Sequence, residues 1–168
     1  MYSIGDKILY GASGVMSISD IREECIGDTA RRYYVLSSAT VSSASQTFVP
    51  VDNADLVALM RPLLTRDEAS AVLSAVSTAP DCDWHADNRK RAEIFKKILE
   101  SGDRVAILAM IRTVNKAGKL REAEGKKNFL SDDTVAKRAE KLVASELSLV
   151  LGISEDAAVE LVKKSTDI

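Results

Sequence analysis

The spacing of apolar residues changes near residue 60, and this change constrains the fold more than any other feature. Before it, short runs of β-branched and aromatic residues are separated by turn residues, which is typical of β-strands. After it, apolar residues recur at every third or fourth position, which is typical of amphipathic helices. The sequence therefore predicts a two-domain α+β protein, with strands in residues 1–60 and an all-α helical bundle in residues 61–168.

Short strands joined by short connections predict a small SH3-like or Tudor-like β-barrel, because closing a small sheet protects its edges. Gly11 and Gly14 supply the first turn, and residues 26–29 supply the second. Residues 37–45 are mostly Ser, Ala and Thr and predict a flexible hairpin loop. Pro50 cannot donate to a central ladder, so the last strand ends near it or lies at an edge. The expected strands are residues 7–10, 15–24, 31–37 and 46–51.

Start and stop signals divide the second domain into helices. Thr65 and Glu68 have the spacing of a capping box. Glycines that follow apolar periodic segments predict left-handed C-terminal caps. Residues 56–64 are the expected hinge between the domains. We expect helices from Thr65 to near Pro80, over residues 87–101 with Gly102 as the cap, over residues 103–117 with a stop at Gly118, from Ser131 to Gly152, and from Ser154 onward.

The net charge of −2 hides an uneven distribution. Residues 80–130 carry twelve basic and eight acidic side chains, a net charge of +4, whereas the segments on either side are each at −3. A local positive segment could bind an anionic partner, although a solvated helix face is the simpler explanation of charge alone.

The chain of 168 residues has no basic region followed by an apolar run at its start, and no run approaches the roughly 18 apolar residues of a membrane span. We therefore expect a cytoplasmic protein with no membrane partner. Cys25 and Cys82 are far apart, and we expect both to be reduced thiols.

Residues for catalysis are scarce. His85 is the sole histidine, and with Asp81, Cys82 and Asp83 it forms a crowded group that could bind a metal but lacks a second Cys/His pair. The simpler interpretation is a polar loop. The sequence has no phosphate-binding glycine loop, since Gly11 and Gly14 lead into a strand rather than a helix. We expect no enzyme activity, no cofactor, no metal and no small-molecule substrate.

Trp84 is the sole tryptophan, and it precedes a helix whose first turns present Arg89, Lys90 and Arg91. An apolar wedge beside cations is the combination that proteins use to widen or kink the DNA minor groove. The alternative is that Trp84 packs into the helical bundle, as large aromatic residues usually do.

Three segments resemble the CarD/CdnL/TRCF family of bacterial transcription regulators: IGDKILYGASGV, YYVLSS with FVPVDNADLVALMRPL, and DWHADNRKRAEIFKKILESGDRVAILAMIRTV. The resemblance implies a Tudor-like domain that binds the β subunit of RNA polymerase. It also implies a helical domain that contacts promoter DNA at the upstream edge of the bubble, with little base specificity. The tryptophan of such proteins wedges into the minor groove and stabilises the open complex.

The resemblance assigns roles to individual residues. Trp84 occupies the wedge position and Arg89 the position of a DNA-contacting cation, whereas Ala86 and Asp87 stand where relatives often have basic residues. Lys90 and Arg91 complete the expected DNA-binding set. Polymerase-contacting arginines of some relatives correspond here to Glu24 and Phe48, and Val49 lies beside Phe48 in the expected interface strand. The sequence thus predicts a non-enzymatic regulator, and the rival is a protein-interaction adaptor without DNA contact, in which Trp84 is core.

Overall fold

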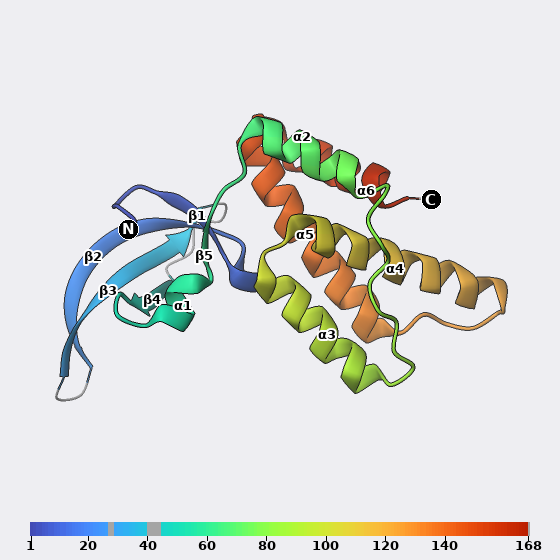
Figure 1. The fold of residues 1–168 in the computed structure, drawn as a ribbon, viewed down its shortest axis with the longest axis horizontal. Helices are drawn as coiled ribbons and strands as arrows, with labels where there is room; N and C mark the ends of the chain where they lie inside the picture. Colours follow the sequence, from blue (N-terminus) through green and yellow to red (C-terminus); the bar gives the residue numbers. More distant parts are fainter. Residues whose placement is uncertain (27–28, 40–44, 168) are drawn as a thin grey trace. The chain divides into compact units, whose positions relative to one another are not determined.

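The structure is a computed structural model that describes residues 1–26, 29–39 and 45–167. It divides into two compact units, Met1–Leu63 and Leu64–Ile168, which we call the sheet unit and the helical unit (Figure 1). An antiparallel sheet makes up the first unit and helices make up the second, which confirms the two-domain α+β prediction.

The described residues of the sheet unit form five antiparallel strands, in the order β4-β3-β2-β1-β5. The central pair, β2 and β3, is a long hairpin that keeps regular pairing except for a register shift between Ile18 and Asp20. A single turn of 3-10 helix, η1 (Gly11–Ser13), links β1 to β2, and a short helix, α1 (Ala54–Ala58), precedes β5. The strands are β1 (Lys7–Tyr10), β2 (Val15–Ile26), β3 (Thr29–Ser38), β4 (Gln46–Pro50) and β5 (Met60–Pro62).

Alternating residues of these strands form a buried cluster in the sheet unit, because every second residue of a strand faces the same side. Met16 and Ile18 on β2 are both buried, in agreement with the alternation in the sequence. Tyr2 closes one side by donating a hydrogen bond from its hydroxyl to the carbonyl oxygen of Met60 (2.7 Å). The cluster comprises Ile8, Tyr10, Met16, Ile18, Tyr34, Leu36, Val49 and Met60.

The expected hinge at residues 56–64 is mostly part of the sheet unit. Asn53 caps α1 by accepting a hydrogen bond from the amide of Leu56 (3.1 Å), and β5 then pairs with β1. The sheet that results has β4 and β5 as its two ends, and α1 contacts both of these strands. Residues 27–28 of the turn predicted at residues 26–29, and residues 40–44 of the loop predicted at residues 37–45, lie outside the described residues.

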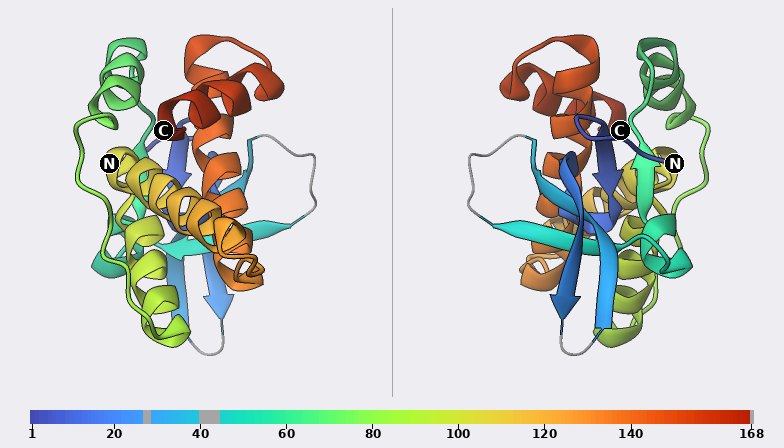
Figure 2. Two further views of the ribbon diagram at one scale, coloured as in Figure 1. Left: turned by 90° about the vertical axis from the view of Figure 1, so that its right-hand side faces the viewer. Right: turned by 90° about the vertical axis from the view of Figure 1, so that its left-hand side faces the viewer.

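Residues 64–167 of the helical unit form five helices, and α4 and α5 contribute most of the buried residues in that range. Helix α4 packs against α5, and α3 contacts both of them (Figure 2). The capping box at Thr65 and the left-handed caps at Gly102 and Gly152 are confirmed. The helices are α2 (Arg66–Ala75), α3 (Asn88–Ser101), α4 (Arg104–Ala123), α5 (Leu130–Leu151) and α6 (Glu155–Thr166).

Three predicted helix ends are wrong. Helix α2 ends at Ala75, whereas the sequence predicted an end near Pro80. Helix α4 continues through Gly118 to Ala123, and a Cβ added to Gly118 would approach the side-chain amide nitrogen of Asn128 to 3.1 Å. The glycine therefore permits a close approach inside the helix rather than ending it. Helix α5 begins at Leu130, with Phe129 and not Ser131 at the N-cap. Phe129 makes no side-chain capping bond, so a search for polar caps could not find it.

Candidate functional sites

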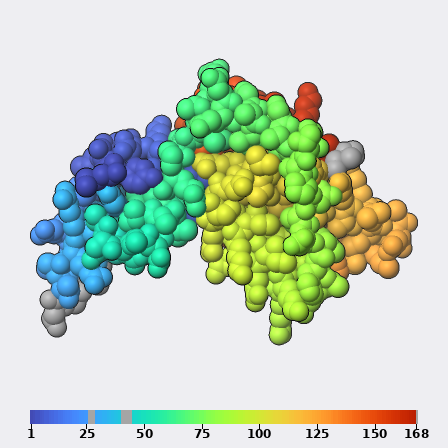
Figure 3. Space-filling model, in the orientation of Figure 1, coloured from blue at the N-terminus to red at the C-terminus, as the bar shows by residue number. Residues whose placement is uncertain are grey.

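Residues 76–87 connect α2 to α3 and run across the surface of the helical unit (Figure 3). The side chain of Arg112 on α4 holds the start of this segment by donating to the carbonyl oxygens of Val76 and Ala79, the latter at 2.6 Å. The backbone amide of Cys82 donates to the hydroxyl of Thr113, also on α4 (3.0 Å). Trp84 follows two residues later, so its backbone directly follows a part of the segment that is fixed to α4.

The Trp84 side chain is exposed, with a relative accessibility of 39% for the residue. It is nevertheless held on one side, because the guanidinium carbon of Arg91 lies over the indole, 4.5 Å from the ring centroid. Phe129 lies against the same guanidinium at 4.7 Å, and Arg121 lies over the Phe129 ring at 4.0 Å. We call this alternating set of Trp84, Arg91, Phe129 and Arg121 the aromatic stack.

The cations predicted to bind DNA separate into two kinds. Arg89 and Lys90 are exposed in the first turn of α3, and none of the ion pairs among the described residues involves them. Arg91 is fully buried and forms an ion pair with Asp132 at 2.7 Å. A guanidinium in this position cannot reach a phosphate, so the structure corrects the role predicted for Arg91.

Phe129, Asp132 and Arg121 also belong to this site, although no sequence motif marks them as members of it. They lie 30–48 residues from Trp84 and Arg91 in sequence, so no local pattern connects them to the tryptophan. Side chains from α4 and the start of α5 are brought to the tryptophan by the packing of the helices, which has no local signature in the sequence.

In the sheet unit, Phe48 lies on the edge strand β4 and is partly exposed. Its ring meets the Tyr33 ring edge-on, with the centroids 6.2 Å apart. The guanidinium of Arg22 lies 5.7 Å from the Phe48 centroid, and its Nε is 2.7 Å from a carboxylate oxygen of Glu24. Arg22 therefore joins the two residues that the resemblance had placed in one interface, although the sequence analysis did not select it.

Val49 differs from its neighbour, because it is fully buried in the core of the sheet unit. Successive residues of a strand face opposite sides, so when Phe48 points outward Val49 must point inward. The structure thus corrects the prediction of a side-chain contact between Val49 and a partner. Among residues 1–26, 29–39 and 45–167, no strand pairs with the second edge of β4.

Comparison with known protein families gives a match for residues 2–64, described as the CarD-like/TRCF RID domain. This match covers nearly all of the sheet unit, which we therefore call the RID domain. Domains of this family interact with the β subunit of RNA polymerase, which supports a role in transcription through binding of polymerase. The match ends where the sheet unit ends, and a comparison with curated proteins found no match.

Beyond the RID domain, the polar group at residues 81–85 is tied to α4. Within the described part of the chain, no group of three or more His, Cys, Asp or Glu side chains is arranged to hold a metal ion. A hydrogen bond from Lys116 (2.7 Å), assisted by Arg112, holds the pKa of the Asp81 carboxyl below its ordinary value. Burial raises the pKa of the Cys82 thiol. His85 accepts a hydrogen bond at Nδ1 from the amide of Asp87 (3.1 Å).

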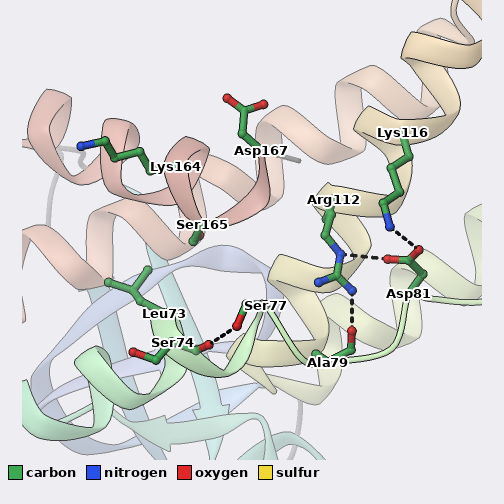
Figure 4. A pocket seen from close by; sticks show the side chains of 10 residues that line it. All are labelled: Leu73, Ser74, Ser77, Ala79, Asp81, Arg112, Lys116, Lys164, Ser165 and Asp167. Atoms are coloured by element: carbon green, nitrogen blue, oxygen red, sulfur yellow. Dashed lines mark hydrogen bonds and ion pairs between the residues drawn. The ribbon is translucent and has the colours of Figure 1, made fainter.

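A cavity of about 750 Å³ lies between α2, α4 and α6 (Figure 4). Two of its cations, Arg112 and Lys116, are directed at Asp81, and Arg112 also binds backbone carbonyl groups. These contacts tie the segment after α2 to α4, so we assign the cations a structural role. No helix among the described residues is long and apolar enough to cross a membrane.

Proposed function

We propose that this protein is a non-enzymatic transcription regulator that binds the β subunit of RNA polymerase through its RID domain and contacts promoter DNA through its helical unit. The observation that carries the proposal is an exposed tryptophan on an anchored segment, in the same chain as a polymerase-interacting domain. In this proposal Trp84 enters the minor groove at the edge of the promoter bubble and stabilises the open complex.

The edge strand β4 supports the polymerase contact. An unpaired strand edge offers backbone donors and acceptors to an added strand, and neighbouring side chains then supply specificity. Phe48, Arg22 and Glu24 are the side chains suited to that role here, since they contact one another and are at least partly exposed. An aromatic ring beside a charged pair replaces the arginines that the resemblance led us to expect.

The surroundings of Trp84 support a DNA contact of limited strength. Arg89 and Lys90 follow the ring and are exposed, so their cationic groups can reach phosphates while the apolar ring meets a base step. Ala86 and Asp87 add no cation, and Asp87 instead caps α3 through the amide of Arg89 (2.7 Å). Contacts to phosphate and groove shape would give little base readout and a shallow dependence on salt.

Such a contact can shift the equilibrium between closed and open promoter complexes only by its differential free energy for the two states. A ring that inserts only where the minor groove is widened or the strands have separated makes most of its contact in the open state. Binding to polymerase through the RID domain would hold the ring near that position.

The test is Trp84→Ala in the full chain, measured by the lifetime of the open complex and by thermal unfolding. The ring is partly exposed and loses one cation–π contact, so we expect a stability loss of about 1 kcal/mol. The open-complex lifetime should fall several-fold, and binding to the β subunit should not change. Leu149→Ala is the matched control, because Leu149 is an apolar residue of similar exposure in the same unit.

The alternative protein-interaction adaptor predicts a different pair of results. If Trp84 acted as core, its removal would cost roughly 3–5 kcal/mol, as for buried tryptophans. An unchanged open-complex lifetime in a stable Trp84→Ala variant would contradict the DNA contact and favour the adaptor.

A further inference from the structure

We propose that Arg91 is a positioning residue, which holds the Trp84 ring in one orientation and is itself locked by Asp132. This inference rests on the proposed function only for what the ring contacts. The contacts that hold the ring belong to the helical unit and can be tested without DNA.

The guanidinium of Arg91 has all five of its N–H donors occupied. Its Nε and one Nη2 hydrogen are directed at the same carboxylate oxygen of Asp132, at 3.0 and 2.7 Å. Its Nη1 donates to the carbonyl oxygens of His85 (2.7 Å) and Ala86 (3.1 Å), and the remaining Nη2 hydrogen is directed at Oδ1 of Asn88 (2.6 Å). A planar group with acceptors on every side cannot rotate, so its two faces have fixed directions.

The guanidinium carbon of Arg91 lies over two aromatic rings, 4.5 Å from the Trp84 centroid and 4.7 Å from the Phe129 centroid. A guanidinium stacks on aromatic faces through both cation–π attraction and planar contact. The fixed guanidinium of Arg91 therefore restrains the orientation of the Trp84 ring. The face that Arg91 covers is not available to a partner, and the ring's remaining surface accounts for its exposure.

The carboxylate that fixes the Arg91 guanidinium lies on a different helix from Arg91 itself. Asp132 lies in the first turn of α5, where the helix dipole favours a carboxylate, and its side chain is only 6% exposed. The acceptors His85 and Ala86 directly follow Trp84 in the chain. One guanidinium thus joins α3, α5 and the backbone next to the tryptophan.

Holding the ring in advance lowers the cost of binding. Immobilising a side chain at an interface costs about 0.5–1.5 kcal/mol, and a side chain that is already held avoids that cost. Loss of the lock should therefore weaken a contact that depends on the ring by roughly 2- to 10-fold.

The central variant is Arg91→Lys, which keeps the charge for Asp132 but lacks the flat face and the fork of donors. Trp84 is the sole tryptophan, so quenching of its fluorescence by acrylamide reports on this ring alone. We expect quenching to increase in the absence of DNA, and the open-complex lifetime to fall by roughly 2- to 10-fold.

Arg104→Lys is the matched control. Arg104 forms a similar ion pair with Glu146 at 2.7 Å in the same helical unit, with 11% of its side chain exposed. Its replacement should lower stability without changing the quenching of Trp84. Phe129→Leu is the second test variant: it removes the far ring of the aromatic stack, keeps Arg91 and Asp132, and should also increase the quenching.

A double variant separates positioning from direct contact. If Arg91 acts through the ring, adding Arg91→Lys to Trp84→Ala should not shorten the open-complex lifetime further. A further shortening would mean that Arg91 acts on DNA independently, and would overturn the proposal. Unchanged quenching in both Arg91→Lys and Phe129→Leu would also overturn it. An unchanged lifetime in Trp84→Ala would instead contradict the proposed function, while the quenching results would still decide how the ring is held.

Discussion

The two units differ in how exposed the side chains of their ion pairs are. In the sheet unit, the ion pairs of the described residues join side chains that are 38–66% exposed. In the helical unit, three arginines with side chains no more than 11% exposed each bind a carboxylate. The pairs are Arg91 with Asp132, Arg104 with Glu146, and Arg112 with Asp81; the carboxylate is buried in the first two pairs and 40% exposed in the third.

The difference follows from where the backbone hydrogen bonds of each unit are formed. Neighbouring strands are joined by ladders of backbone hydrogen bonds, which fix their register without any help from charged side chains. An α-helix makes its backbone hydrogen bonds internally, so side chains alone determine how two helices pack. The three arginines join α3 to α5, α4 to α5, and the segment after α2 to α4.

Breaking the most buried pair should have the largest effect. Asp132→Ala leaves the Arg91 charge buried without its carboxylate, and removing one partner of a buried pair costs about 3–5 kcal/mol. The sole tryptophan lies in the helical unit and all four tyrosines lie in the sheet unit, so the two fluorescence signals follow the units separately. Urea unfolding should show a lower midpoint for the tryptophan signal, and the tyrosine signal is the internal reference.

Asp133→Ala is the control for this experiment, because Asp133 lies in the same first turn of α5 and is half-buried. It should lose only its interaction with the helix dipole, about 0.3–1 kcal/mol. If the two substitutions lowered the stability of the helical unit equally, the buried ion pair would contribute no more to that stability than the helix-dipole interaction does.

Local signals predicted much of the fold. The capping box at Thr65, the left-handed glycine at residue 102 and the alternation in β2 depend on neighbours within a few residues, and all three are confirmed. Gly118 shows where such signals fail. A glycine after an apolar run predicts a helix end, but here the space it leaves is used by Asn128, a contact that only the folded chain reveals.

The candidate sites were less predictable for the same reason. Trp84 could be selected from composition because it is unique, but the choice between exposed and core needed the structure. Arg91 resembles Arg89 and Lys90 in sequence, and only the position of Asp132, 41 residues away, shows that it is buried. Val49 and Phe48 are adjacent apolar residues, and only the register of β4 shows which one faces the core.

A half-exposed pair in the helical unit should have an intermediate effect that depends on pH. The pKa of Asp81 is lowered in the folded protein from its ordinary value of 3.8, chiefly by the hydrogen bond from Lys116. A lowered folded pKa gives stability that is present above about pH 4 and is lost as the pH falls through the folded pKa.

The contribution should stay below about 1 kcal/mol, because the Asp81 side chain is 40% exposed and screened by solvent. Asp81→Asn should lower the melting temperature of the helical unit slightly at neutral pH and should reduce the difference between neutral pH and pH below about 4. Arg112 keeps its carbonyl acceptors in that variant, so the unit should still fold. A pH dependence identical to that of the unmodified protein would exclude Asp81 as its source.

The smallest effect on stability is expected in the sheet unit, where function and stability should separate. Arg22 pairs with Glu24 and Asp20 at the surface, and exposed pairs of this kind contribute about 0–1 kcal/mol. Arg22→Ala should therefore leave the tyrosine-detected unfolding midpoint almost unchanged. The same substitution removes the cation beside Phe48 and frees the Glu24 carboxylate, so binding to the β subunit should change if that edge is the interface.

Arg31→Ala is the control, since Arg31 lies on the same hairpin but pairs with Asp52, at a distance of 4.0 Å. A pull-down with the β subunit that weakens for Arg22→Ala and not for Arg31→Ala would locate the interface at β4, and equal binding by both variants would place it on another part of the RID domain.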